Sequence, residues 1–149
     1  MEVDPELTAM AGADCIFCRI IAGESPCEAI WQDAQCLAFM DINPVNDGHC
    51  LVIPKAHYEN LFAMPPEAFG RVALAAAMVA RAVDAELRPG GMNLVEANGA
   101  FARQSVFHVH IHVLPRREGD NLLINWDPQR GDSTRIAEIA ARLRARLRG

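Results

Sequence analysis

Three histidines occur at every second position of residues 107–116, at His108, His110 and His112. In an extended strand alternate side chains lie on the same face, so this spacing places three imidazoles in a row. The residues between them are apolar and would form the opposite, core-facing side of the strand. Because the unperturbed pKa of imidazole is the closest to neutrality of any side chain, the row is a candidate for nucleophilic, acid-base or metal chemistry.

The three imidazoles are too far apart on a straight strand to hold one metal ion together. Alternate residues are about 6.6 Å apart and the outer two about 13 Å, whereas a metal–nitrogen bond is about 2 Å long. We therefore expect the three histidines to have different roles.

A second cluster offers ligands for a metal. Two residues separate Cys15 from Cys18, and this spacing lets two thiolates of one turn bind the same tetrahedral zinc ion. His57 and one histidine of the row would complete a Cys2His2 shell, and zinc with four protein ligands would be structural. The alternative is that both cysteines are buried small residues and that His57 lies on the surface.

The loop before the histidines carries amide, hydroxyl and backbone donors, at Asn98, Gly99, Gln104 and Ser105. Such donors suit phosphate oxygens and the charge that develops on them during phosphoryl transfer. The loop therefore favours a phosphate ester or amide as substrate. A polar loop ahead of a purely structural strand is equally consistent with these residues alone.

The elements that position these residues can be placed from periodicity and turn signals. We expect a short helix or turn that Asp14 opens and Gly23 closes. Apolar residues three and four apart predict an amphipathic helix over 66–87. A last helix over 134–147 should leave its arginines in solvent and bury Ile136, Ile139, Ala140, Leu143 and Leu147. Strands are predicted at 28–32, 35–40, within 49–58, at 92–96 and at 106–114.

Size and composition bound the class of protein. A chain of 149 residues, 51% hydrophobic, predicts a flexible leader at 1–13 followed by a single domain at 14–149. No apolar run is long enough to cross a membrane, and the acidic leader does not look like a signal peptide. A net charge of −5 argues against binding along a nucleic-acid polymer. Five cysteines, an odd number, favour free thiols in a reducing compartment, and hence the cytoplasm.

Several motifs together resemble the histidine-triad (HIT) family of nucleotide hydrolases and transferases, in its zinc-bearing bacterial form. The resemblance rests on DCIFCRIIAGE, LAFMDINPVNDGHCLVIPKAHYENL and QSVFHVHIHVLPRREGD, which agree in order and spacing. It implies an α+β fold, a five-stranded antiparallel sheet with a long central helix and a C-terminal helix. It also implies a homodimer with a continuous sheet.

The resemblance implies a reaction at the α-phosphorus of a purine nucleotide, in which the middle histidine, His110, attacks and forms a nucleotidyl-histidine. Water then releases a nucleoside monophosphate from phosphoramidates, adenylylated amines or dinucleoside polyphosphates. The same comparison implies that His112 orients His110, that His49 lies beside the triad, and that Ser105 and Gln104 contact phosphate or leaving-group oxygens. It implies that Asp41 accepts hydrogen bonds from the ribose and that four apolar residues enclose the base: Ile16, Phe17, Ile42 and Leu51. It also implies that a structural zinc ion is bound by Cys15, Cys18, His57 and His108.

Each of these roles has a plainer alternative. His49 could be a core histidine, Asp41 could form the turn before Asn43, and the apolar residues could be core. The chain also departs from the family pattern at Ala97, where an amide is usual, and at Arg103, where glycine is usual. Asn98 or Arg103 could replace the missing donor, or the substrate could differ.

Two other functions stay open. The first is a noncatalytic purine-nucleotide-binding or interaction protein with the same fold. The second is a metallohydrolase in which zinc activates water.

Overall fold

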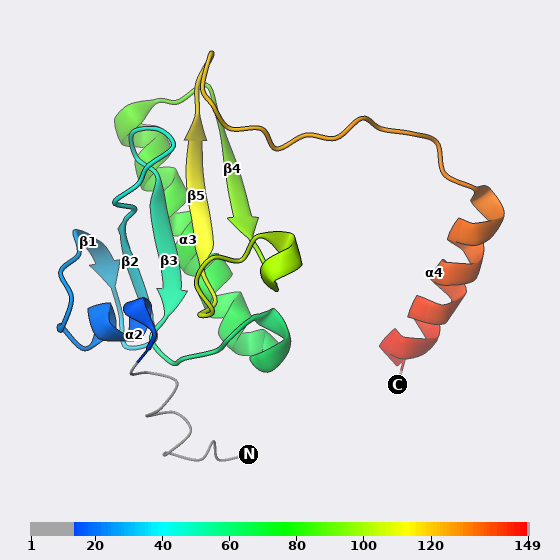
Figure 1. The fold of residues 1–149 in the computed structure, drawn as a ribbon, viewed down its shortest axis with the longest axis horizontal. Coiled ribbons are helices and arrows are strands. Elements are labelled where there is room, and N and C mark those ends of the chain that lie inside the picture. The colour runs from blue at the N-terminus through cyan, green and yellow to red at the C-terminus, as the bar shows by residue number, and fades with distance from the viewer. Residues whose placement is uncertain (1–13, 149) are drawn as a thin grey trace.

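A computed structural model describes residues 14–148, and the expected leader at 1–13 lies outside them. The sheet order is β1-β2-β3-β5-β4 and every neighbouring pair is antiparallel, which confirms the predicted five-stranded sheet (Figure 1). The strands are β1 (Ala29–Gln32), β2 (Cys36–Met40), β3 (Cys50–Pro54), β4 (Gly91–Glu96) and β5 (Ile111–Arg116). Two single-turn 3-10 helices, η1 (Leu61–Ala63) and η2 (Ala100–Ala102), lie in the connections.

The long helix α3 (Pro66–Leu87) has the bounds that its periodicity predicts. Proline at its first turn fits a position where the backbone N–H has no helical partner, and Arg88 ends the helix in the left-handed conformation at φ 47°. Val72 and Ala76 of its buried stripe pack on one face of the sheet, against Val52 and Val113. This layer forms the larger core.

The opposite face of the sheet is covered by the short helix α2 (Ile16–Ile21), where Phe17 packs against Phe39 and Leu51. Cys15, and not the expected Asp14, caps this helix, because the Cys15 Sγ accepts a hydrogen bond from the Cys18 N–H at 3.4 Å. The cap residue is thus one of the predicted metal ligands.

The histidine row differs from its prediction, because β5 begins at Ile111 and not at Val106. The Val109 N–H donates to the Tyr58 carbonyl at 2.8 Å, outside the ladder of the sheet, so the chain bends before it enters the strand. Only His112 of the three histidines lies in β5. Val109, Ile111 and Val113 nevertheless face α3, as the alternation predicts.

The last helix, α4 (Ser133–Arg148), begins one residue earlier than expected and has no buried residue. The expectation that it buries an apolar face within this chain is wrong: the segment after β5 carries it past β4, and it stands apart from the sheet (Figure 1). Across the described residues, no helix combines the length and apolarity that crossing a membrane requires.

Candidate active site and metal centre

A cavity of about 720 Å³ opens on the α2 side of the sheet. His110 and His112 line it, together with His49 from the start of β3. The structure therefore brings the last two histidines of the row, His110 and His112, and His49 to one cavity, although the segment between Phe107 and His110 is not a strand.

The imidazole of His110 is oriented by the chain's own backbone. Its Nδ1 lies 2.7 Å from the carbonyl oxygen of His108, which can only accept, so Nδ1 carries the proton and donates. Because the neutral form of imidazole has one N–H, the neutral form of His110 has its lone pair on Nε2. The ring makes a T-shaped contact with Phe17, with ring centroids 5.2 Å apart and planes at 84°, which restrains its plane. His110 is thus a buried imidazole with its nucleophilic nitrogen free.

His112 receives its orientation through His49. The Val45 N–H donates to Nδ1 of His49 at 3.1 Å, so the proton of neutral His49 is on Nε2. That Nε2–H points at Nδ1 of His112, 3.0 Å away, and leaves the proton of neutral His112 on its own Nε2. Burial, and then the nearby His110 and His49, lowers the pKa of His112 from 6.5 to about 4. His112 is therefore neutral near pH 7 and presents an N–H donor.

Asp41 forms a turn and also lines the cavity. Its Oδ1 accepts from the Asn43 N–H at 2.8 Å and forms the turn, while its Oδ2 lies 3.3 Å from Nε2 of His49. The same carboxylate lines the cavity, where it can meet a ligand hydroxyl. Asp41 opposes the effect of burial on His49, but burial dominates and the pKa of His49 is lowered.

The apolar wall of the cavity contains all four residues that were expected there: Ile16, Phe17, Ile42 and Leu51. Phe17 and Leu51 are buried, whereas Ile42 is 87% exposed and stands at the mouth. Phe39 and Cys27 also line the wall, although neither was expected there. Phe39 could have been found, because it alternates with Leu37 along β2 on the same face.

Ser105 is the residue of the predicted phosphate loop that lines the cavity. The Gln104 amide holds the loop itself: its Oε1 accepts from the Gly99 N–H at 2.7 Å, and its Nε2 donates to the Glu59 carbonyl at 2.6 Å. Asn98 is similarly engaged, since its Oδ1 accepts from the Leu61 N–H at 2.7 Å. Neither amide is among the cavity-lining residues, so their contacts with phosphate stay a prediction.

The first histidine of the row, His108, faces away from this cavity and toward Cys15 and Cys18. Its Nε2 lies 2.7 Å from the Pro54 carbonyl and must donate, which leaves Nδ1 with a lone pair. That Nδ1 lies 3.5 Å from Sγ of Cys15, 3.6 Å from Sγ of Cys18 and 3.2 Å from Nδ1 of His57. The four residues proposed as metal ligands therefore meet at one point.

The spacing of these donor atoms fits a tetrahedral ion. With bonds of about 2.0 Å to nitrogen and about 2.3 Å to sulfur, ligand atoms around zinc are separated by about 3.3–3.8 Å. All four donors lie within 4.8 Å of one another, and the Cys18 Sγ is 3.2 Å from Nδ1 of His57. Burial, and then the neighbouring Cys15, raises the pKa of Cys18 to about 12, so two thiolates would need a cation between them. The donor set of two thiolates and two imidazoles suits zinc.

Comparison with known proteins agrees with this geometry. The family profile described as "HIT domain" matches residues 22–119. The chain is 42% identical over 109 residues to a protein of Arabidopsis thaliana named adenylylsulfatase HINT3, covering 73% of this chain and 55% of that protein. This chain thus spans about half the length of that relative. It is 34% identical over 142 residues to adenosine 5'-monophosphoramidase HNT1 of Saccharomyces cerevisiae, covering 95% of this chain and 87% of that one.

One similar solved structure contains a metal. It is described as a zinc-bound histidine triad family protein from Mycobacterium smegmatis, and it matches with a TM-score of 0.71 and 40% identity over 90% of this chain and 98% of that chain. A match over that share of the chain extends beyond residue 132, so it includes part of the C-terminal helix.

Proposed function

Because the chain belongs to the HIT domain family, we propose that it is a hydrolase that cleaves a nucleotide derivative at the α-phosphorus and releases a nucleoside monophosphate. The observation that carries this proposal is the hydrogen bond from Nδ1 of His110 to the His108 carbonyl. It places the lone pair of the neutral imidazole on Nε2, in a buried ring at the wall of a cavity large enough for a nucleotide. The names of the two relatives, each a hydrolase of an adenylyl compound, support the same reaction class.

The reaction consists of two displacements at phosphorus. Nε2 of His110 forms a bond to the α-phosphorus while the bond to the leaving group breaks, and the departing atom takes a proton from solvent water. The Nε2–H of His112 donates a hydrogen bond to a phosphoryl oxygen, where negative charge develops. Water then forms the new bond to phosphorus, the phosphorus–nitrogen bond breaks, and the proton that this water loses passes to solvent. Ser105 lies at the cavity wall, where its hydroxyl can donate to a phosphate oxygen.

The cavity also indicates the kind of substrate. Its apolar wall, which includes Phe17, Leu51 and Ile42, suits the flat faces of a purine base, and Asp41 suits the hydroxyls of a ribose. The substrates that we propose are nucleoside phosphoramidates, adenylylated amines and dinucleoside polyphosphates.

The proposal is tested by AMP release. The purified protein is expected to release AMP from adenosine phosphoramidate, lysyl-AMP or a diadenosine polyphosphate, and His110→Ala is expected to abolish the release. Rapid quenching of the wild-type reaction should trap protein that carries the nucleotidyl group. Undiminished turnover by His110→Ala would disprove the covalent mechanism. Tight binding of AMP without turnover of any of these substrates would favour the noncatalytic binding protein.

The metal centre is proposed to be structural. Cys15, Cys18, His57 and His108 would hold zinc with all four positions filled by protein, and the ion would join α2 to the segment after β3 and the segment before β5. Zinc so enclosed contributes to folding and keeps no open position for water.

We also propose that the protein is a homodimer. The strand order leaves β4 at one edge of the sheet, and Leu94 on that strand is 50% exposed. An uncovered edge with an exposed apolar residue is prone to pair with another strand. A second copy that adds its own β4 by a two-fold axis would continue the sheet.

A further inference from the structure

The C-terminal helix α4 carries an apolar face without a partner among the described residues. Ile136, Ile139 and Leu143 lie at intervals of three and four and are 59%, 39% and 56% exposed. A stripe of this kind is stable in water only when another surface covers it. The face therefore indicates a binding partner for α4.

The charge of α4 limits which partner this can be. The helix has five arginines and one glutamate, a net charge of +4, whereas residues 14–132 of the same chain carry a net charge of −6. A basic helix is thus joined to an acidic body. The negative body repels nucleic acids and anionic membranes, while a second acidic body of the same kind attracts α4.

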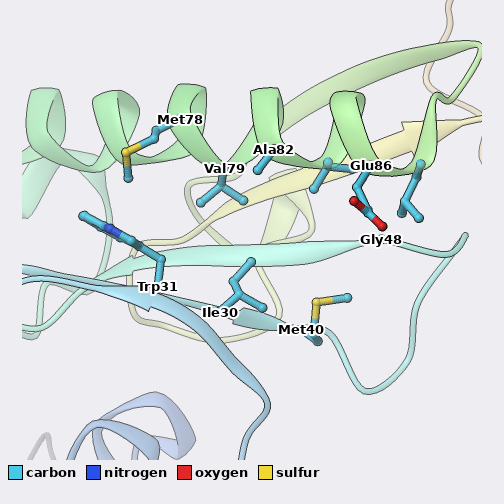
Figure 2. Close-up of a pocket in the computed structure, with 10 residues that line it drawn as sticks. Ile30, Trp31, Met40, Gly48, Met78, Val79, Ala82 and Glu86 are labelled. Carbon is cyan, nitrogen blue, oxygen red and sulfur yellow. The ribbon is translucent and has the colours of Figure 1, made fainter.

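The acidic body has an apolar groove on its α3 side (Figure 2). Ile30 and Trp31 of β1 face Met78 and Ala82 of α3 across a cavity of about 390 Å³, and Glu86 is the ionisable residue among those that line it. This is the opposite face of the sheet from the nucleotide cavity. The groove follows α3 from Met78 to Leu87, about 14 Å of helix, and the apolar stripe of α4 from Ile136 to Leu147 covers about 17 Å. Helix and groove thus match in length and in chemistry.

The groove that α4 fills belongs to a second copy, because the chain after β5 leads away from the groove of its own copy. Arg116 donates to Oδ1 of Asn93 on β4 at 2.8 Å and to the Leu122 carbonyl at 2.7 Å, and it pairs with Asp120. Asp120 also accepts from Nδ2 of Asn46, in the turn before β3. Beyond these contacts the chain passes β4 and leads away from β1, whereas the groove lies between β1 and α3 at the other end of the strand order (Figure 1).

We propose that α4 of each protomer docks into the groove between α3 and β1 of a second copy. Two such contacts, exchanged by a two-fold axis, make the assembly closed. Asp84 and Glu86 outnumber Arg88 at the carboxyl end of α3, so that end attracts the arginine-rich carboxyl end of α4 and sets the two helices parallel. This inference shares with the proposed function only the requirement for a second copy, and its test does not depend on hydrolysis.

The test compares matched variants by sedimentation velocity over a range of protein concentrations. Leu143→Asp places a charge on the apolar face of α4, and Ala145→Asp places the same charge on the opposite face of the same exposed helix. Ala82→Arg places a cation in the groove, and Ala85→Arg places one on exposed α3 outside it. We expect Leu143→Asp and Ala82→Arg to weaken the dimer about 10-fold or more and both controls to leave it unchanged.

A mixture of the two disruptive variants shows whether the contact joins two copies. The Ala82→Arg protomer keeps a functional α4 and the Leu143→Asp protomer keeps an open groove, so a mixed dimer retains one of the two contacts. We expect the mixture to associate more tightly than either variant alone. Equal association of Leu143→Asp and its control, or no gain on mixing, would overturn the inference. AMP release measured on the same samples reports separately on the proposed reaction, in which none of these four residues takes part.

Discussion

Nε2 of His49 lies 3.0 Å from Nδ1 of His112, and the direction of this hydrogen bond is set by the backbone of Val45. Because the Val45 N–H occupies Nδ1 of His49, His49 can only donate to His112. The backbone amide of Val45 thus determines which nitrogen of His112, far away in the sequence, carries the proton.

Replacing His49 should therefore slow the reaction without preventing nucleotide binding. His49→Phe keeps a ring but removes the donor, so His112 can place its proton on Nδ1 and no longer present Nε2–H to a phosphoryl oxygen. We expect kcat to fall about 100-fold with little change in KM.

His49→Gln is the matched variant, because its amide can donate to the same nitrogen. It should recover part of the rate and keep the wild-type pH profile. Wild-type kcat in His49→Phe would show that His49 has only a packing role.

The free energy of unfolding should fall as the pH is lowered from about 6.5 to about 4, in part because of His112. Its pKa is lowered by burial from 6.5 to about 4, so between these values the unfolded chain binds more protons than the folded one. The contribution is complete above pH 6.5 and is lost as the pH falls toward 4. Urea denaturation at pH 7 and pH 5 measures this, and His112→Asn should lose less stability over the interval. An equal loss in both proteins would assign the pH dependence to other groups.

Removing the metal should destabilise the fold and expose two thiols. We expect metal analysis to find zinc in the purified protein, and a strong chelator to lower Tm and make Cys15 and Cys18 reactive toward a thiol reagent. Cys50 is the internal control, because burial raises the pKa of its thiol to about 11 and keeps it unreactive in the folded chain.

A folded, metal-free Cys15→Ser protein separates the two possible roles of zinc. Retained AMP release would rule out a zinc-activated water and support a structural ion. Loss of the chemical step in a protein whose circular dichroism and nucleotide affinity are unchanged would argue for the metallohydrolase.

Gly48 should tolerate alanine less well than Gly23 does. Both have a positive φ, +90° at Gly48 and +77° at Gly23. A Cβ on Gly48 would lie 2.5 Å from Cδ1 of Leu87 and 3.2 Å from Cγ of Pro115, whereas a Cβ on Gly23 would have no neighbouring atom within 4 Å. We expect Gly23→Ala to cost about 1 kcal/mol from backbone strain, and Gly48→Ala about 1–3 kcal/mol more because of the added crowding. Chemical denaturation measures both, and equal losses would show that Leu87 and Pro115 move aside freely.

The parts of the fold that the sequence predicts correctly are those in which local signals agree. The helix over 66–87 has apolar residues at helical spacing, proline at its start and Arg88-Pro89-Gly90-Gly91 at its end, and α3 has these bounds. The sheet is confirmed for a similar reason, since the short strands are separated by turn residues.

The remaining differences depend on contacts that the local pattern does not contain. The strand at the histidines begins late because Val109 bonds to Tyr58, which is 51 residues away. The periodicity of α4 identifies its apolar face but not what covers that face, so the expected burial within one chain is wrong. In the site, the side-chain amides of Gln104 and Asn98 were predicted to suit phosphate because of their residue type. Only the folded loop shows that both amides already have hydrogen-bond partners in the backbone.

His108 takes part in two different sites through two different parts of the residue. Its imidazole lies with Cys15, Cys18 and His57, while its main-chain oxygen holds Nδ1 of His110. Every amino acid has that oxygen. An evolving lineage could therefore exchange the imidazole, and the metal with it, while the next histidine stays correctly aligned, provided that the bend over 106–110 is stabilised in another way. One proposed metal ligand, His108, is thus only two residues from the proposed nucleophile, His110, yet the two can diverge independently.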